Sequence, residues 1–257
     1  MFLLACLGVL FPRVLRSPAV WAALTFLVFA RVVRLWPAAD NHYYLLAYWC
    51  LAVFLSLIME RPREALATSA RWLLAFVFAF AFLWKVLLAP DYVDGRFFRV
   101  TLLTDERFAY ISQLLGGISA DELAENREYL RTLPPGAELV DPPRLREPPA
   151  LRRVAIAFTW GSLLLEGALA LAFLFPWGRW TLPVRDGLLL SFCTVTYAFA
   201  PVSGFGWLLA VMGLAQVEPE RRVLRASYLV VWFLILFYGD VPWARLLLGV
   251  IGGGPGA

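Results

Sequence analysis

Lysine is almost absent from this chain of 257 residues, which holds 22 arginines and a single lysine, Lys85. Histidine is equally rare, with His42 alone, and charged residues make up only 16% of the sequence. A soluble domain is about one quarter charged, so this shortage argues against a soluble globular protein. The three cysteines, Cys6, Cys50 and Cys193, all lie in apolar runs, which argues against a disulfide framework or a zinc site.

The sequence is instead rich in apolar residues. Hydrophobic residues make up 61% of it and the mean hydropathy is +0.71. Several apolar runs approach the roughly 20 residues that a membrane helix needs. The sequence therefore predicts an all-α, multi-pass membrane bundle of about six or seven helices, with residues 1–257 as a single transmembrane domain. The predicted membrane segments lie at about 18–36, 43–59, 70–89, 153–177, 182–201, 203–217 and 226–250.

Arginines in the turns predict the orientation of this bundle. The net charge of +4 is spread over the loops as isolated residues, a pattern that favours membrane orientation over nucleic-acid binding. By the positive-inside rule, the arginine-rich face is cytoplasmic, and we expect a bacterial inner membrane protein. The residues on that face are Arg13, Arg16, Arg61, Arg63, Arg71, Arg179, Arg185, Arg221, Arg222 and Arg225.

The long polar segment 90–152 is then exoplasmic. Ser119, followed three residues later by Glu122, forms a capping-box pattern that predicts one short helix running to about Leu130. Proline pairs at 134–135, 142–143 and 148–149 predict an extended connector back to the bilayer. At this length the segment is too long for a simple turn, and we expect it to cap the bundle. The alternative is a tether with no role.

Lys85 stands in the apolar run 72–89, where a charge is costly and usually marks a functional site. Counting along the helices puts Lys85 about 7 Å below the exoplasmic boundary. His42 lies at the same end of the preceding antiparallel helix. Two acids are candidate partners for the amine: Glu166 near mid-bilayer, and Asp240 closer to the depth of Lys85.

These residues suggest proton abstraction. Desolvation disfavours a charged amine, so an unpaired lysine in an apolar pocket can serve as a general base. A nearby histidine would stabilise an oxyanion, and a lipid-soluble acid such as a hydroquinone would suit the pocket. A neighbouring acid opposes this chemistry, so the distance from Lys85 to the acid decides between base and ion pair. A third possibility is that the amine extends to the lipid headgroups.

Short motifs resemble a known family. Residues 41–45 read Asn-His-Tyr-Tyr-Leu and resemble the Asn-His-x-Tyr-Leu motif of the transmembrane domain of vitamin K-dependent γ-carboxylase and its bacterial relatives, the horizontally transferred transmembrane (HTTM) proteins. Phe-Leu-Trp-Lys at 82–85 and Pro-Asp-Tyr-Val-Asp-Gly at 90–95 resemble the family's Ala-Gly-x-Lys and Asp-Trp-x-x-Gly segments. Leu165-Glu166 matches an acid in the family's next helix.

The resemblance implies that Lys85 is the base that deprotonates a hydroquinone, with His42 and Asn41 as its partners, on the exoplasmic face. It covers roughly residues 1–215. Compared with the family, we expect the first helix and the large lumenal domain to be missing. A family histidine near 190–200 is also absent, because Cys193, Thr194 and Thr196 stand there.

Two functions remain open. The first is a non-catalytic or accessory subunit of a larger membrane complex, whose partners are the lipid bilayer and other membrane proteins. The alternative is an enzyme or binder of a quinol-like or lipid substrate that uses Lys85 with His42. A quinone, a hydroquinone or a bound lipid is the expected cofactor, and no metal is expected.

Overall fold

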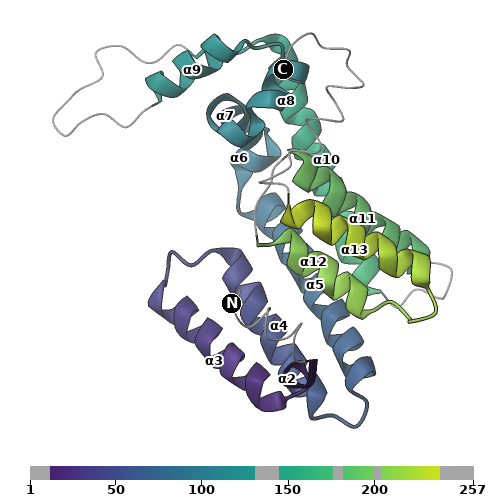
Figure 1. Ribbon diagram of the computed structural model, residues 1–257. Coiled ribbons are helices and arrows are strands. Elements are labelled where there is room, and N and C mark those ends of the chain that lie inside the picture. The colour runs from purple at the N-terminus through teal and green to yellow at the C-terminus, as the bar shows by residue number, and fades with distance from the viewer. Residues whose placement is uncertain (1–11, 131–144, 176–181, 200–203, 238–257) are drawn as a thin grey trace. The chain divides into compact units, whose positions relative to one another are not determined.

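The computed structural model describes residues 12–130, 145–175, 182–199 and 204–237, and every regular element in these ranges is a helix (Figure 1). The all-α prediction is therefore confirmed for this part of the chain. A short helix, α2 (Pro12–Leu15), comes first. Within the described ranges, one helix overlaps each predicted membrane segment: α3 (Pro18–Arg34), α4 (Asn41–Leu57), α5 (Pro62–Leu87), α10 (Pro149–Leu174), α11 (Leu182–Phe199), α12 (Gly206–Ala215) and α13 (Arg222–Leu236). Residues 238–250 of the last predicted segment lie outside these ranges.

Proline defines where several of these helices begin. Pro18, Pro62, Pro90 and Pro149 each stand first in a helix. This is the position where the missing N–H costs nothing and the fixed φ suits the helix. Because Pro149 begins α10, this helix starts four residues before the predicted membrane segment.

In the described part of the chain, two helices are long and apolar enough to cross a membrane. Both α5 and α10 have 26 residues, which corresponds to about 39 Å at 1.5 Å per residue. A third apolar helix, α12, is shorter, with 10 residues. The number of membrane spans and the membrane location itself stay predictions.

The described residues divide into two compact units. The first contains residues 12–77, 169–175, 182–194 and 204–237. Within it, α3 packs against α4, and α12 packs against α13. The second contains residues 78–130, 145–168 and 195–199. Helices α5, α10 and α11 each contribute residues to both units.

In its described part, the segment after α5 contains the predicted short helix and four further short helices that were not predicted. It folds into α6 (Pro90–Val93), α7 (Arg96–Thr104), the 3₁₀ helix η1 (Glu106–Phe108), α8 (Ala109–Gly116) and α9 (Ala120–Tyr129). Gly95 (φ +82°) and Gly117 (φ +66°) lie between these helices in the left-handed region, which glycine adopts without strain and which permits the tight turns.

The predicted capping box is confirmed at the start of α9. The Glu122 backbone N–H donates to Ser119 Oγ over 3.2 Å, and the Ser119 N–H donates to Glu122 Oε2 over 2.9 Å. The Pro-rich residues 131–144 lie outside the described ranges.

These short helices have a hydrophobic core of their own, and the start of α10 is part of it. Leu151 and Ala155 of α10 are fully buried there, next to Leu102, Ile118 and Leu123. The same segment is fixed by buried Asn126, which binds the backbone of Arg146 through both ends of its amide, at 2.9 and 2.8 Å. The first turns of α10 therefore share a core with residues 90–130, and we name the two together the cap segment after its predicted role.

Candidate functional site

Lys85 and Glu166 form an ion pair within the second unit. Lys85 stands in the last turn of α5, where a cation interacts favourably with the helix dipole. Glu166 projects from α10 and its side chain is 9% exposed, against 22% for Lys85. The next residue, Gly167, lets the helices approach, because a Cβ there would lie 3.2 Å from the Phe82 ring.

Tyr92 contacts the Lys85 amine, and Ser162 in turn contacts Tyr92. The Lys85 Nζ atom lies 4.7 Å from the centre of the Tyr92 ring, a cation–π geometry. Tyr92 is buried, and its hydroxyl is 2.7 Å from Ser162 Oγ. Ser162 in turn donates to the Thr159 carbonyl over 2.9 Å. A connected polar chain thus runs from Lys85 to the backbone of α10.

Glu166 retains one unused acceptor. Its Oε1 atom accepts the hydrogen bond from Lys85, whereas the buried Oε2 atom has no partner among the described residues. A buried acceptor without a donor costs about 1–3 kcal/mol. This oxygen can therefore accept a hydrogen bond from a ligand hydroxyl or a water molecule.

Of the two candidate acids, Glu166 lies beside Lys85. Depth counting favoured Asp240 over Glu166, but Lys85 pairs with Glu166, and Asp240 lies outside the described residues.

After α5 the chain runs back along α10. Gly95 lies against Ile156 and Thr159, and Arg99 forms a two-pronged ion pair with Glu147. These contacts extend the packing of the chain after α5 along α10, which begins at the ion pair of Lys85 with Glu166. They explain how a lysine near the end of one helix meets an acid in the middle of another.

His42 and Asn41 lie in the first unit, at the start of α4. The His42 ring contacts the Tyr43 ring, with centroids 4.3 Å apart. Its other neighbour is Gly204, where a Cβ would lie 3.1 Å from His42 Cδ2. Asn41 is exposed. Because Lys85 belongs to the second unit, the predicted partnership of His42 and Asn41 with Lys85 stays a prediction.

A second buried polar cluster was not predicted. In α11, Arg185 donates to Asp186 Oδ1 over 3.2 Å, and the same oxygen accepts the Tyr228 hydroxyl of α13 over 2.9 Å. All three side chains are at least nine-tenths buried. The sequence does hold a signal for this cluster, since Arg185 and Asp186 are adjacent near the start of an apolar helix. Arg185 was interpreted only as one of the arginines that predict the membrane orientation.

Among the described residues, no three His, Cys, Asp or Glu side chains converge to hold a metal ion. Searches against protein-family models, curated proteins and solved structures find no match to this sequence. The family resemblance therefore stays a prediction based on its motifs.

Proposed function

We propose that this chain is an integral membrane protein with an HTTM-like fold, and that it serves as a non-catalytic subunit of a larger membrane complex. The observation that carries this proposal is the engagement of the Lys85 amine by Glu166 and by the Tyr92 ring. The amine is the group on which a catalytic function would depend.

A general base needs a free electron pair. A carboxylate partner and the face of an aromatic ring both stabilise the ammonium form, in which no such pair exists. The pair also joins α5 to α10, the two helices long enough to cross a membrane. Its arrangement thus favours a structural role in holding the helices together over proton abstraction.

Exposed apolar side chains support the membrane location and the presence of partners. Phe26 of α3, Phe80 of α5 and Leu164 of α10 are each more than 60% exposed. Large apolar surfaces of this kind contact lipid tails or neighbouring membrane helices.

The test is purification from the native membrane in a mild detergent, with the bound proteins identified by mass spectrometry. We expect partner subunits at a fixed ratio to this chain. We also expect the double variant Lys85→Met/Glu166→Leu to retain them, since an apolar pair of similar volume can replace a buried ion pair. Isolation of the wild-type chain without any stoichiometric partner would contradict the proposal.

A second candidate is a binder of a hydroquinone or another hydroxyl-bearing lipid, and the unpartnered Oε2 atom of Glu166 favours it. Such a hydroxyl would donate to this oxygen beside the ammonium group. To test this function, quinones are extracted from the purified wild-type protein and from the variants Glu166→Gln and Glu64→Gln. The second variant is the control, because Glu64 is an exposed acid on α5. Retention that is lost only in Glu166→Gln would support this function, and equal retention in all three would exclude it.

A further inference from the structure

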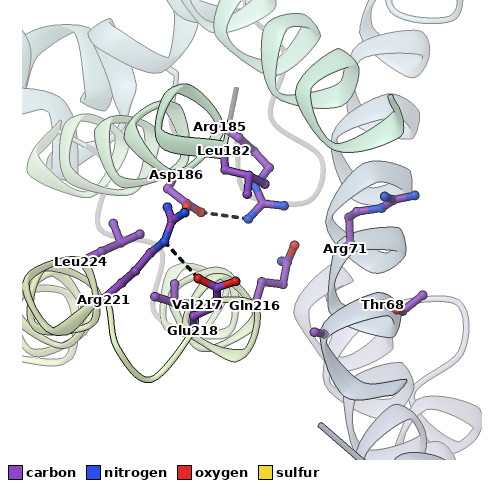
Figure 2. A pocket seen from close by; sticks show the side chains of 11 residues that line it. Thr68, Arg71, Leu182, Arg185, Asp186, Gln216, Val217, Glu218, Arg221 and Leu224 are labelled. Atoms are coloured by element: carbon purple, nitrogen blue, oxygen red, sulfur yellow. Dashed lines mark hydrogen bonds and ion pairs between the residues drawn. The ribbon is translucent and has the colours of Figure 1, made fainter. Parts of the chain in front are cut away.

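A cavity of about 270 Å³ lies within the first unit, among α5, α11 and the turn that joins α12 to α13. Figure 2 shows side chains from α11 and from this turn directed at the same space, with α5 on the opposite side. The polar groups that line it include Arg71, Arg185, Asp186, Gln216, Glu218 and Arg221.

Two of the three arginines carry hydrogen-bond donors without acceptors. Arg185 is 9% exposed, and its buried Nε atom has no partner among the described residues. The buried Nε atom of Arg71 is unpartnered in the same way. A buried donor without an acceptor is unfavourable, so both positions call for an anion or an ordered polar group.

The acids at the cavity do not neutralise its arginines. Asp186 binds Arg185 but also accepts the Tyr228 hydroxyl. Glu218 pairs with Arg221 at 3.4 Å. Arg71 has no acidic partner in the described part of the chain and contacts the Trp72 ring instead. Three arginines and two acids thus line the cavity.

More positive charge lies just behind the cavity wall. The carbonyl of Val217, a lining residue, accepts hydrogen bonds from both Arg63 and Arg225, each at 3.4 Å. This end of the first unit therefore carries five arginines around one small space.

We propose that this cavity is a binding site for a phosphate group. The planar fork of arginine matches phosphate oxygens with paired hydrogen bonds, which a lysine cannot provide. The volume falls just below the roughly 300 Å³ at which sites for drug-sized ligands begin, so it suits a phosphate with a small substituent. The source is the headgroup of an anionic lipid or free phosphate. The site is independent of the role of Lys85.

The experiment uses the full chain after removal of native lipids, in detergent, with two probes. Native mass spectrometry compares retained phosphatidylglycerol with phosphatidylcholine, whose choline cation opposes the arginines. In parallel, inorganic phosphate is titrated at constant ionic strength while the unfolding temperature is measured. The variants are Arg71→Gln, Arg185→Gln and, as a matched control, Arg222→Gln, which neutralises an exposed arginine next to Arg221 that does not line the cavity.

Preferential binding of phosphatidylglycerol that weakens at least about tenfold in Arg71→Gln, and is unchanged in Arg222→Gln, would support a lipid headgroup site. A rise in unfolding temperature with inorganic phosphate that disappears in Arg71→Gln would support free phosphate as ligand. Binding of neither probe, or equal weakening in Arg71→Gln and Arg222→Gln, would overturn the proposal. Arg71→Gln keeps the test valid even where Arg185→Gln does not fold.

Discussion

At the scale of single residues, the choice of lysine at position 85 has a geometric reason. One ammonium group contacts a single carboxylate oxygen of Glu166 and the face of the Tyr92 ring at the same time. An ammonium is a compact charge that suits this arrangement, whereas a guanidinium is planar and pairs with both oxygens of a carboxylate. The one lysine among 22 arginines thus stands where the arginine geometry would fit poorly.

Removing either member of this pair should destabilise the protein. We expect Lys85→Met or Glu166→Leu alone to lower the free energy of unfolding by about 3 kcal/mol, because each leaves a buried charge without its partner. The double variant should recover most of that loss. Thermal unfolding in detergent measures all three, with Arg61→Gln at the exposed Arg61–Glu64 pair as control, where we expect less than about 1 kcal/mol. Additive losses in the double variant would contradict a coupled pair.

Gly213 of α12 gives the second residue-scale prediction. A Cβ at this position would lie 2.3 Å from Tyr228 Cε1 and 2.9 Å from Leu189 Cδ2. Tyr228 is fully buried and its hydroxyl is held by Asp186, so the ring cannot move aside freely. We therefore expect Gly213→Ala to cost about 2 kcal/mol of stability.

The matched control for Gly213 is Gly187 of α11, where a Cβ would meet nothing within 4 Å. Here alanine should stabilise the helix by up to about 1 kcal/mol. Chemical or thermal unfolding of the two variants should therefore change in opposite directions. A similar effect of both substitutions would show that the close approach of Tyr228 to α12 is not tight.

At the scale of elements, the cap segment is where the sequence was least informative. Its helices are short, and α7 packs against both α8 and α9, so the burial that stabilises them comes from neighbours rather than from a long apolar run. Only α9 carried a local signal, the Ser119–Glu122 capping box. Leu102, Leu103 and Ile111 of its core stand in short apolar clusters interrupted by polar residues, which are too short to predict a helix by themselves.

Acidic pH should lower the stability of the cap segment. A hydrogen bond from the Arg107 side chain lowers the pKa of Asp105, and one from the Ser119 backbone N–H lowers the pKa of Glu122. Because both folded-state pKa values lie below the unfolded ones, the stability they supply is complete above about pH 4 and is lost as the pH falls through the folded values.

Hydrogen-exchange protection factors for peptides covering 96–130, measured between pH 3 and pH 7, test this effect. We expect protection to fall toward pH 3, and the fall to be smaller in Asp105→Asn than in wild type. Asp121→Asn, an exposed position in the first turn of α9, serves as control. An unchanged acid response in Asp105→Asn would remove this carboxylate from the explanation.

At the scale of the whole molecule, the long helices could be predicted because each contains a long, mostly apolar run bounded by proline or polar residues. Lys85 and Glu166 could be identified, since charges in such runs are rare. Their pairing could be predicted only as one of two candidates, because counting along separate helices does not fix which acid meets the amine. The arginine cavity was also missed, since three segments far apart in sequence form it.

The arrangement of the chain across a membrane is the most direct prediction at this scale. The proposed topology puts Gln113 of α8 on the exoplasmic side and Glu220, in the turn before α13, on the cytoplasmic side, and both are exposed. In a background with Cys6, Cys50 and Cys193 replaced by alanine, we introduce Gln113→Cys or Glu220→Cys. A membrane-impermeant maleimide should label only Gln113→Cys in intact cells or sealed spheroplasts, and both variants after permeabilisation. The reverse pattern would invert the topology, and labelling of both positions before permeabilisation would mean that the chain between them does not cross the membrane as proposed.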